Sequence, residues 1–246
     1  MRTSNRLSPV LALLLATAAG AAPPEKPKNL RYFPKTIARD ALIQRMREFS
    51  FALGVRCQHC HAGGDGVSFD GVNFSSDAKP AKVTAREMLR LVDTLNDKLL
   101  ARLPARQQPP VKMECVFCHR GLPVPRTLAT ELTAVLDKDG IPAAVARYRV
   151  LRAKTMPLGR YNFDEWTMNE LARSLAAAGK ADAAIAMLEL NAEFYPESAD
   201  IDLQLAQLHR TRGERAKAIA RYRAAIAKDP KLEMARKGLE ELEGTP

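Results

Sequence analysis

The sequence predicts an all-α protein in which a helical domain is followed by a short α-solenoid. Three observations support this fold class. Apolar residues recur at the i, i+3, i+4 spacing of a buried helix face, a short cysteine-histidine motif occurs twice, and the last third repeats itself at an interval of 34 residues. With 246 residues, the chain has enough material for one or two domains, each with a hydrophobic core.

Residues 1–21 have the pattern of a secretory signal peptide. Two arginines are followed by an apolar stretch that ends in Ala19-Gly20-Ala21, which resembles a cleavage site. Residues 22–35 are rich in Pro and Lys and are expected to form an extended lead-in. We expect export to the periplasm. We also expect no transmembrane segment in the mature chain, because no later apolar run is long enough to span a bilayer.

The charge of the chain is unevenly distributed. The formal net charge is +10: the two arginines of residues 1–21 contribute +2, residues 22–164 contribute +10 and residues 165–246 contribute −2. Nucleic acid is a poor candidate partner, because the protein is expected to be exported and its basic residues form no recognisable nucleic-acid module. A basic face that steers acidic redox partners is a better interpretation than nucleic-acid binding, and an ordinary solvated surface is an equal alternative.

The first predicted helix begins near Thr36 and ends at Leu53. An apolar stripe runs along it, and Gly54 is a typical residue to follow a helix C-terminus. The stripe consists of Leu42, Ile43, Met46, Phe49 and Leu53.

A C-x-x-C-H motif follows this helix and occurs a second time further along the chain. The first copy supplies Cys57, Cys60 and His61, and the second supplies Cys115, Cys118 and His119. This spacing is typical of covalent c-type haem attachment, in which two thiols bind the haem vinyl groups and the histidine binds the iron as proximal ligand. The two motifs use all four cysteines and predict two covalently bound haems. A redox cysteine pair or a zinc knuckle would leave both histidines unexplained.

Between the motifs, residues 62–76 are expected to form a loop, because they carry several glycines and small polar residues. A second long helix is expected from Ser76 or Asp77 to about Leu103. Its predicted buried stripe consists of Ala85, Met88, Val92, Leu95 and Leu99.

Three segments together resemble a known family. They are M-x-x-F-x-x-x-L-G-V-x-C-x-x-C-H, KPAKVTAREMLRLVDTLN and C-V-F-C-H-R-G. The region is similar to one two-haem half of the cytochrome c subunit of photosynthetic reaction centres, and the resemblance covers residues 36–125, our expected dihaem domain. Only two haem motifs are present, and the C-terminal third departs from that family.

The resemblance implies the distal iron ligands. In that family a helix methionine that precedes a haem motif supplies the sixth ligand, and the matching positions are Met46, opposite His61, and Met88, opposite His119. The alternative is that both methionines only fill the core, as methionines on a helix stripe usually do. Met113 lies only two residues before Cys115, too close to reach the far side of the haem easily, and His59 lies between the two cysteines of its own motif, so neither is a good candidate.

The rest of the chain is also expected to be helical. Residues 126–163 contain two short helical patterns, which we interpret as a connector. Residues 164–246 are predicted to form two tetratricopeptide-like repeats and a capping helix, because small residues such as Gly179 and Ala184 recur 34 positions later as Gly213 and Ala218. His209 is expected to be a packed or solvated residue and not a haem ligand.

These features favour an exported electron carrier that exchanges electrons with redox partner proteins, among them membrane electron-transfer complexes. The repeats would then dock a partner. Two alternatives remain open: a dihaem enzyme of peroxidase type with one open iron site, and an assembly protein in which the repeats do the main work. A carrier is favoured over an enzyme, because filled axial positions keep substrate from the iron and His59 is the one spare histidine near the motifs.

Overall fold

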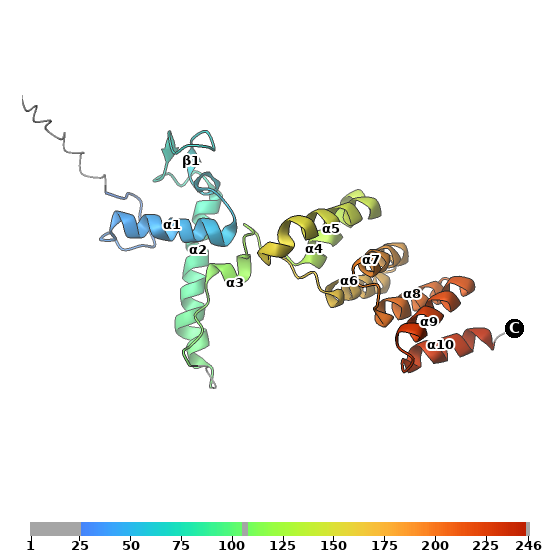
Figure 1. Cartoon of the computed structure of the whole chain (residues 1–246). Coiled ribbons are helices and arrows are strands. Elements are labelled where there is room, and N and C mark those ends of the chain that lie inside the picture. The colour runs from blue at the N-terminus through green and yellow to red at the C-terminus, as the bar shows by residue number, and fades with distance from the viewer. Residues whose placement is uncertain (1–25, 105–107, 245–246) are drawn as a thin grey trace, which may run out of the picture. The chain divides into compact units, whose positions relative to one another are not determined.

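The computed structural model describes residues 26–104 and 108–244, so the predicted signal peptide lies outside the described residues. The chain divides into two compact units. Within the described residues, the first consists of 26–47 and 57–94 and the second of 48–56 and 95–244. The described part is mostly helical and contains very little strand (Figure 1), which confirms the predicted all-α class.

Helix α1 spans Arg39–Leu53 and agrees with the first predicted helix at its C-terminal end. Gly54 ends it with φ +65°, a left-handed conformation that glycine adopts without steric cost. The lead-in before α1 is held by side chains. Tyr32 Oη donates to Asp93 Oδ2 at 2.6 Å, and Asn29 Nδ2 donates to the carbonyl of Ser75 at 2.6 Å.

The expected loop contains one short two-stranded ladder. Strands β1 (Ala62–Gly63) and β2 (Val72–Asn73) pair antiparallel. Helix α2 (Pro80–Thr94) follows and continues into a π-helical stretch, η2 (Leu95–Leu99), and a 3-10 turn, η3 (Leu100–Arg102).

The prediction of a buried stripe on this second helix is wrong for the polypeptide alone. No residue of α2 is buried, and Met88 and Leu99 are 41% and 51% exposed. The physical reason is that the described polypeptide packs no hydrophobic cluster against the helix: both such clusters consist of residues from Leu122 onward.

Helix α3 (Cys115–His119) is a single turn. After it, α4 (Leu128–Asp139) and α5 (Ile141–Thr155) form an antiparallel pair, and a short 3-10 turn, η4 (Met156–Leu158), follows. These helices cover the stretch predicted as a connector. Leu132 of α4 and Tyr148 of α5 belong to one buried cluster with Leu171 and Leu188, which come from the region of the predicted repeats.

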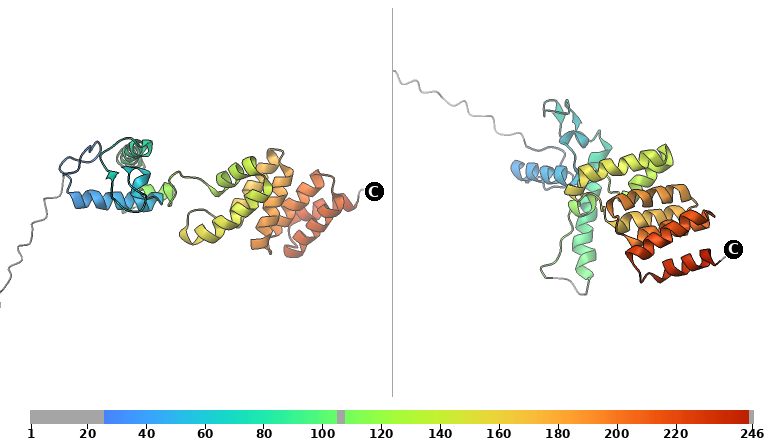
Figure 2. Two further views of the ribbon diagram at one scale, coloured as in Figure 1. Left: turned by 90° about the horizontal axis from the view of Figure 1, so that it is seen from above. Right: turned by 45° about the vertical axis from the view of Figure 1, so that its right-hand side comes forward.

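The next four helices form two consecutive antiparallel pairs, α6 with α7 and α8 with α9, and α10 packs against α9 (Figure 2). Their bounds are α6 Glu165–Ala177, α7 Ala181–Phe194, α8 Ala199–Thr211, α9 Arg215–Lys228 and α10 Glu233–Glu243. Helices α8 and α9 begin 34 residues after α6 and α7, at the interval expected from the sequence.

The repeated interval extends to the ends of the helices. Asp164 caps α6 by accepting the Thr167 N–H at 2.8 Å, and Ser198 caps α8 by accepting the Ile201 N–H at 3.2 Å. Gly179 and Gly213 occupy equivalent left-handed positions after α6 and α8, with φ +76° and +72°. Among the described residues, no helix is both long and apolar enough to cross a lipid bilayer.

Candidate haem-attachment sites

The first motif forms one tight helical turn, η1 (Cys57–His59), three residues beyond Gly54. The N–H groups of Cys60 and His61 both donate to the carbonyl of Cys57, at 3.2 and 2.9 Å. Residues three and four apart in a helical turn share one face, so both thiols and the imidazole of this motif lie on the same side. Neither thiol forms a disulfide, and both are half-buried. Burial is the main cause that raises the pKa of Cys60.

The hairpin and the start of α2 hold the first motif in place. Gln58 Nε2 donates to the carbonyl of Ser68 at 2.8 Å, and Lys79 Nζ donates to the carbonyl of Gln58. The aromatic ring of Phe74, just after β2, lies 5.0 Å from the ring of His61 between centroids. Nδ1 of His61 is buried and has no hydrogen-bond partner.

A charged cluster lies beside this first motif. Asp77 pairs with Arg86 at 2.9 Å, with Lys82 at 3.4 Å and with Arg31 at 3.5 Å. The hydrogen bond from Arg86 is the largest cause that holds the pKa of Asp77 well below its usual range. Burial, and then the charge of Lys82, lowers the pKa of His61, although the Phe74 carbonyl acts in the opposite sense. The lowered pKa favours the neutral imidazole, which is the form that binds a metal.

The second motif occupies all of α3. Cys115 and Cys118 are one helical turn apart, and the chain leaves the helix through Arg120, whose φ of 45° and ψ of 40° are left-handed. Gly121 is also left-handed, with φ +78°, and the N–H of Leu122 donates to the carbonyl of His119 at 2.8 Å. Two left-handed central residues closed by this bond make a tight type I′ turn.

This turn fixes the tautomer of His119. Its Nδ1 lies 2.8 Å from the carbonyl oxygen of Leu122. A carbonyl oxygen only accepts hydrogen bonds, so Nδ1 carries the proton and donates. The lone pair is then on Nε2, the nitrogen that an iron ion would take.

A side-chain clamp positions the chain before the second motif. Asn96, in η2, is buried, and both polar atoms of its amide bind one residue, Met113. Its Nδ2 donates to the Met113 carbonyl at 2.9 Å, and its Oδ1 accepts the Met113 N–H at 2.7 Å. Met113 precedes Cys115 by two residues, so the clamp anchors the entry to α3.

Two glycines bring the chain segments next to the motifs together within the second unit. The N–H of Gly121 donates to the carbonyl of Ala52 at 2.9 Å. A Cβ atom on Gly54 would lie 2.2 Å from the carbonyl oxygen of Gly121, so only glycine fits at position 54. Gly54 comes shortly before Cys57, and Gly121 shortly after His119.

The two candidate distal ligands lie on the two long helices. Met46 is half-buried on α1, and Met88 is partly exposed on α2. Met46 and His61 both belong to the first unit. Met88 also belongs to the first unit, whereas His119 belongs to the second.

The residues present fit a haem group. Each motif offers two thiols and an imidazole on one helical turn, and α2 presents an amphipathic face that the described polypeptide does not bury. An apolar face of this kind needs an apolar partner, and a haem macrocycle is one. The orphaned Nδ1 of His61 and the fixed tautomer of His119 both occur at the expected proximal ligands.

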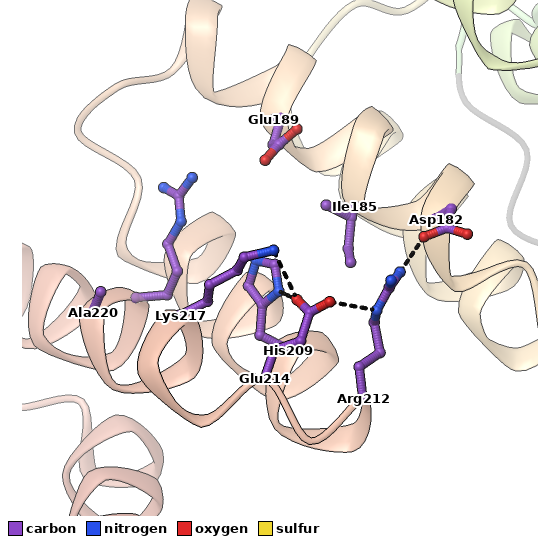
Figure 3. Close-up of a pocket in the computed structure, with 9 residues that line it drawn as sticks. Asp182, Ile185, Glu189, His209, Arg212, Glu214, Lys217 and Ala220 are labelled. Carbon is purple, nitrogen blue, oxygen red and sulfur yellow. Dashed lines mark hydrogen bonds and ion pairs between the residues drawn. The ribbon is translucent and has the colours of Figure 1, made fainter.

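A second group of titratable side chains lies among the C-terminal helices. It lines a cavity of about 330 Å³ between α7, α8 and α9 (Figure 3). His209 is buried there and its Nδ1 lies 2.6 Å from Glu214 Oε2; Glu214 also accepts from Arg212 and Lys217. Arg212 also pairs with Asp182. His209 is thus a packed residue, and the group ties the α8–α9 turn to α7.

Sequence reasoning identified the cysteines and histidines as candidates but missed the residues that contact and position them. Leu122 and Phe74 act through a backbone carbonyl and a ring that no motif identifies, and Asn96 is distant in sequence from the segment that it holds. The Arg-Gly pair after His119 was the available signal for the tight turn.

Comparison with known proteins places the motifs in a known context. Residues 56–156 match the family described as the photosynthetic reaction centre cytochrome C subunit. The matched stretch contains both C-x-x-C-H motifs and Met88, and it extends through α4 and α5; Met46 and the helices from α6 onward lie outside it. The region around the motifs is therefore similar to c-type cytochromes, in agreement with covalently bound c-type haem.

One curated relative supports the same conclusion. Cytochrome c-554 from Chloroflexus aurantiacus (strain ATCC 29366 / DSM 635 / J-10-fl) is 42% identical over 103 residues. The aligned part makes up 38% of this chain and 22% of that protein. The chain thus spans about a fifth of the length of this relative.

Proposed function

We propose that the protein is a dihaem c-type cytochrome that carries electrons between redox proteins. The observation that carries the proposal is the geometry of the two motifs. Each motif is a helical turn with two thiols and the expected proximal imidazole on one face. The similarity of residues 56–156 to a c-type cytochrome family supports it.

The roles of the residues follow from their chemistry. The Cys57 and Cys60 thiols hold the first haem, and the Cys115 and Cys118 thiols hold the second. His61 and His119 are the proximal ligands. A bound haem supplies an iron that takes up and releases one electron. The chain contributes the ligand set, the burial and the nearby charge that set the reduction potential.

Met46 and Met88 are proposed as the distal ligands. Both lie on helices with an apolar stripe, and the family resemblance assigns this role to a helix methionine before each motif. If Met46 and Met88 bound the iron as well as the histidines, they would keep substrate away from it, which favours a carrier over a peroxidase-type enzyme.

The C-terminal helices are proposed to be tetratricopeptide-like repeats that dock a partner protein. Support comes from the 34-residue interval between helix starts and from equivalent caps at Asp164 and Ser198. The proposed site of action is the periplasm. The pattern of residues 1–21 supports export, and the four cysteines, all in the described part of the chain, form no disulfide and are available for haem.

Counting haems tests the proposal. The protein is produced with a c-type haem attachment system, and covalent haem per chain is measured by mass spectrometry and the pyridine haemochrome spectrum. We expect two haems in the wild type and one in each double variant, Cys57→Ala with Cys60→Ala and Cys115→Ala with Cys118→Ala. A wild type with one haem or none would contradict the proposal.

A further inference from the structure

The two proximal histidines have different partners at Nδ1. His119 donates to the carbonyl of Leu122 at 2.8 Å, whereas the buried Nδ1 of His61 has no hydrogen-bond partner. The Phe74 carbonyl lies near the His61 ring and raises its pKa, but it makes no hydrogen bond to Nδ1 and accepts instead from Lys82 Nζ at 2.8 Å. A histidine ligand that donates its second N–H is a stronger base and favours the more positive, ferric iron. With haem bound at both motifs, this difference would lower the reduction potential at the second motif relative to the first.

The charges around the first motif also favour a higher reduction potential at the first motif than at the second. Lys82 and Arg86 both lie near His61, and their side chains are only 12% and 11% exposed, so solvent screens them weakly. With Arg31, three cations share one anion, Asp77, which leaves an excess of positive charge. Positive charge close to a haem disfavours the ferric state, which carries one more positive charge than the ferrous state. The cluster therefore raises the potential at the first motif.

Cations also lie near the second motif, and their charge would raise the potential there. Arg120 directly follows His119 in the turn. The Arg160 side chain lies beside Gly121, where a Cβ would meet its Nε at 2.9 Å. Arg160 approaches the turn that follows His119, whereas the hydrogen bond to Leu122 acts on the ligand ring itself. The hydrogen bond to the His119 ring therefore influences the iron more directly than the charge of Arg160 does.

We propose that the haem attached at Cys57–His61 has the higher midpoint potential and the haem attached at Cys115–His119 the lower. This inference rests on the proposed two-haem function. It makes the first motif the site that is reduced first and oxidised last. Lys82 is then a positioning and charge-setting residue for the first haem: it orients the Phe74 carbonyl and places its charge near His61.

A spectroelectrochemical titration of the full holoprotein tests this order. The wild type is compared with Lys82→Gln, with Lys82→Arg, which keeps the charge, and with Lys217→Gln, which makes the same charge change in α9. We expect Lys82→Gln to lower the higher midpoint potential and leave the lower one in place. Lys82→Arg should keep the higher midpoint potential close to its wild-type value, and Lys217→Gln should change neither potential.

The outcomes separate this inference from the proposed function. Haem is counted on the same samples, and a wild type without two haems refutes the proposed function itself. With two haems present, movement of the lower potential, of both alike or of neither in Lys82→Gln overturns the assigned order. If Lys82→Gln does not fold, the two double cysteine variants decide. The haem left by Cys115→Ala with Cys118→Ala should titrate at the higher potential, and the reverse order would overturn the inference.

Discussion

His119 Nδ1 donates to the carbonyl oxygen of Leu122 across 2.8 Å, and Leu122 is followed directly by Pro123. A residue before proline is restricted to extended backbone conformations. Pro123 therefore limits the directions in which the Leu122 carbonyl can point. The sequence Arg120-Gly121-Leu122-Pro123 is a small device that closes a tight turn and aims an acceptor at the proximal ligand.

Loosening this turn should change the reduction potential of the second haem. Pro123→Ala frees the Leu122 backbone and weakens the bond to His119, so we expect the lower of the two potentials to rise. The lost restriction of the unfolded chain should also reduce stability by about 0.4–1 kcal/mol. Pro125→Ala, in the same exposed segment, is the matched control and should leave both potentials unchanged. An unaltered lower potential in Pro123→Ala would show that the Leu122 carbonyl does not tune the haem.

The hydrogen bonds of Asn96 to Met113 should stabilise the second motif and not the first. Asn96→Ala leaves the N–H and carbonyl of Met113 without their partner, and we expect a loss of about 1–3 kcal/mol in the free energy of unfolding. The absorption spectrum of the second haem should become heterogeneous while that of the first stays sharp. Asn73→Ala, which removes exposed turn bonds to Ser75 and Ser76, should cost less. Equal effects on both haems would argue against a local role.

Gly54 allows a clean comparison of steric and conformational effects. Alanine at a left-handed position costs about 1–2 kcal/mol by itself. Gly54→Ala adds a collision with the Gly121 carbonyl, whereas Gly66, with φ +84°, has no atom within 4 Å of the added Cβ. Urea unfolding should therefore show a larger loss for Gly54→Ala than for Gly66→Ala. Equal losses would mean that the backbones at Gly54 and Gly121 are not closely packed.

The two equivalent helix caps should respond differently to pH. Asp164→Ala and Ser198→Ala should each reduce stability by about 1 kcal/mol at neutral pH. The hydrogen bond from Thr167 is the largest cause that lowers the pKa of Asp164 below its usual 3.8. A lowered carboxyl pKa contributes stability above the usual value that is lost as the pH falls through the lowered one. The penalty of Asp164→Ala should thus shrink below about pH 4, whereas that of Ser198→Ala should not; parallel acid unfolding curves would refute the charged cap.

Local pattern was enough to predict the all-α fold, and it identified the cysteines and histidines that we expect to hold haem. Gly54 marked the end of α1, and the recurrence of Gly179 at Gly213 gave the interval of the C-terminal pairs, because these signals lie within a few residues of the elements that they set. The supporting residues of the site could not be predicted. Phe74 reaches His61 through a hairpin, Asn96 reaches Met113 across an irregular segment, and Leu122 contributes only its backbone.

The α2 stripe shows a different limit of sequence reasoning. Apolar spacing correctly identified the helix, but it cannot tell whether the partner of an apolar face is protein or a prosthetic group. Met88 and Leu99 were expected to be buried, yet the polypeptide leaves them partly exposed. An amphipathic helix whose apolar face contacts no protein core is what we expect of a helix that packs against haem.

Carbon monoxide binding to the reduced holoprotein tests most directly whether the protein carries two closed, six-coordinate haems. The wild type should show no change in absorbance at either haem, because Met46 and Met88 fill the distal positions. Met46→Ala and Met88→Ala should each bind carbon monoxide at one haem, while Met234→Ala, an exposed methionine of α10, should behave like the wild type. Binding by the wild-type protein would contradict the methionine assignment at that haem and favour an enzyme with an open iron site.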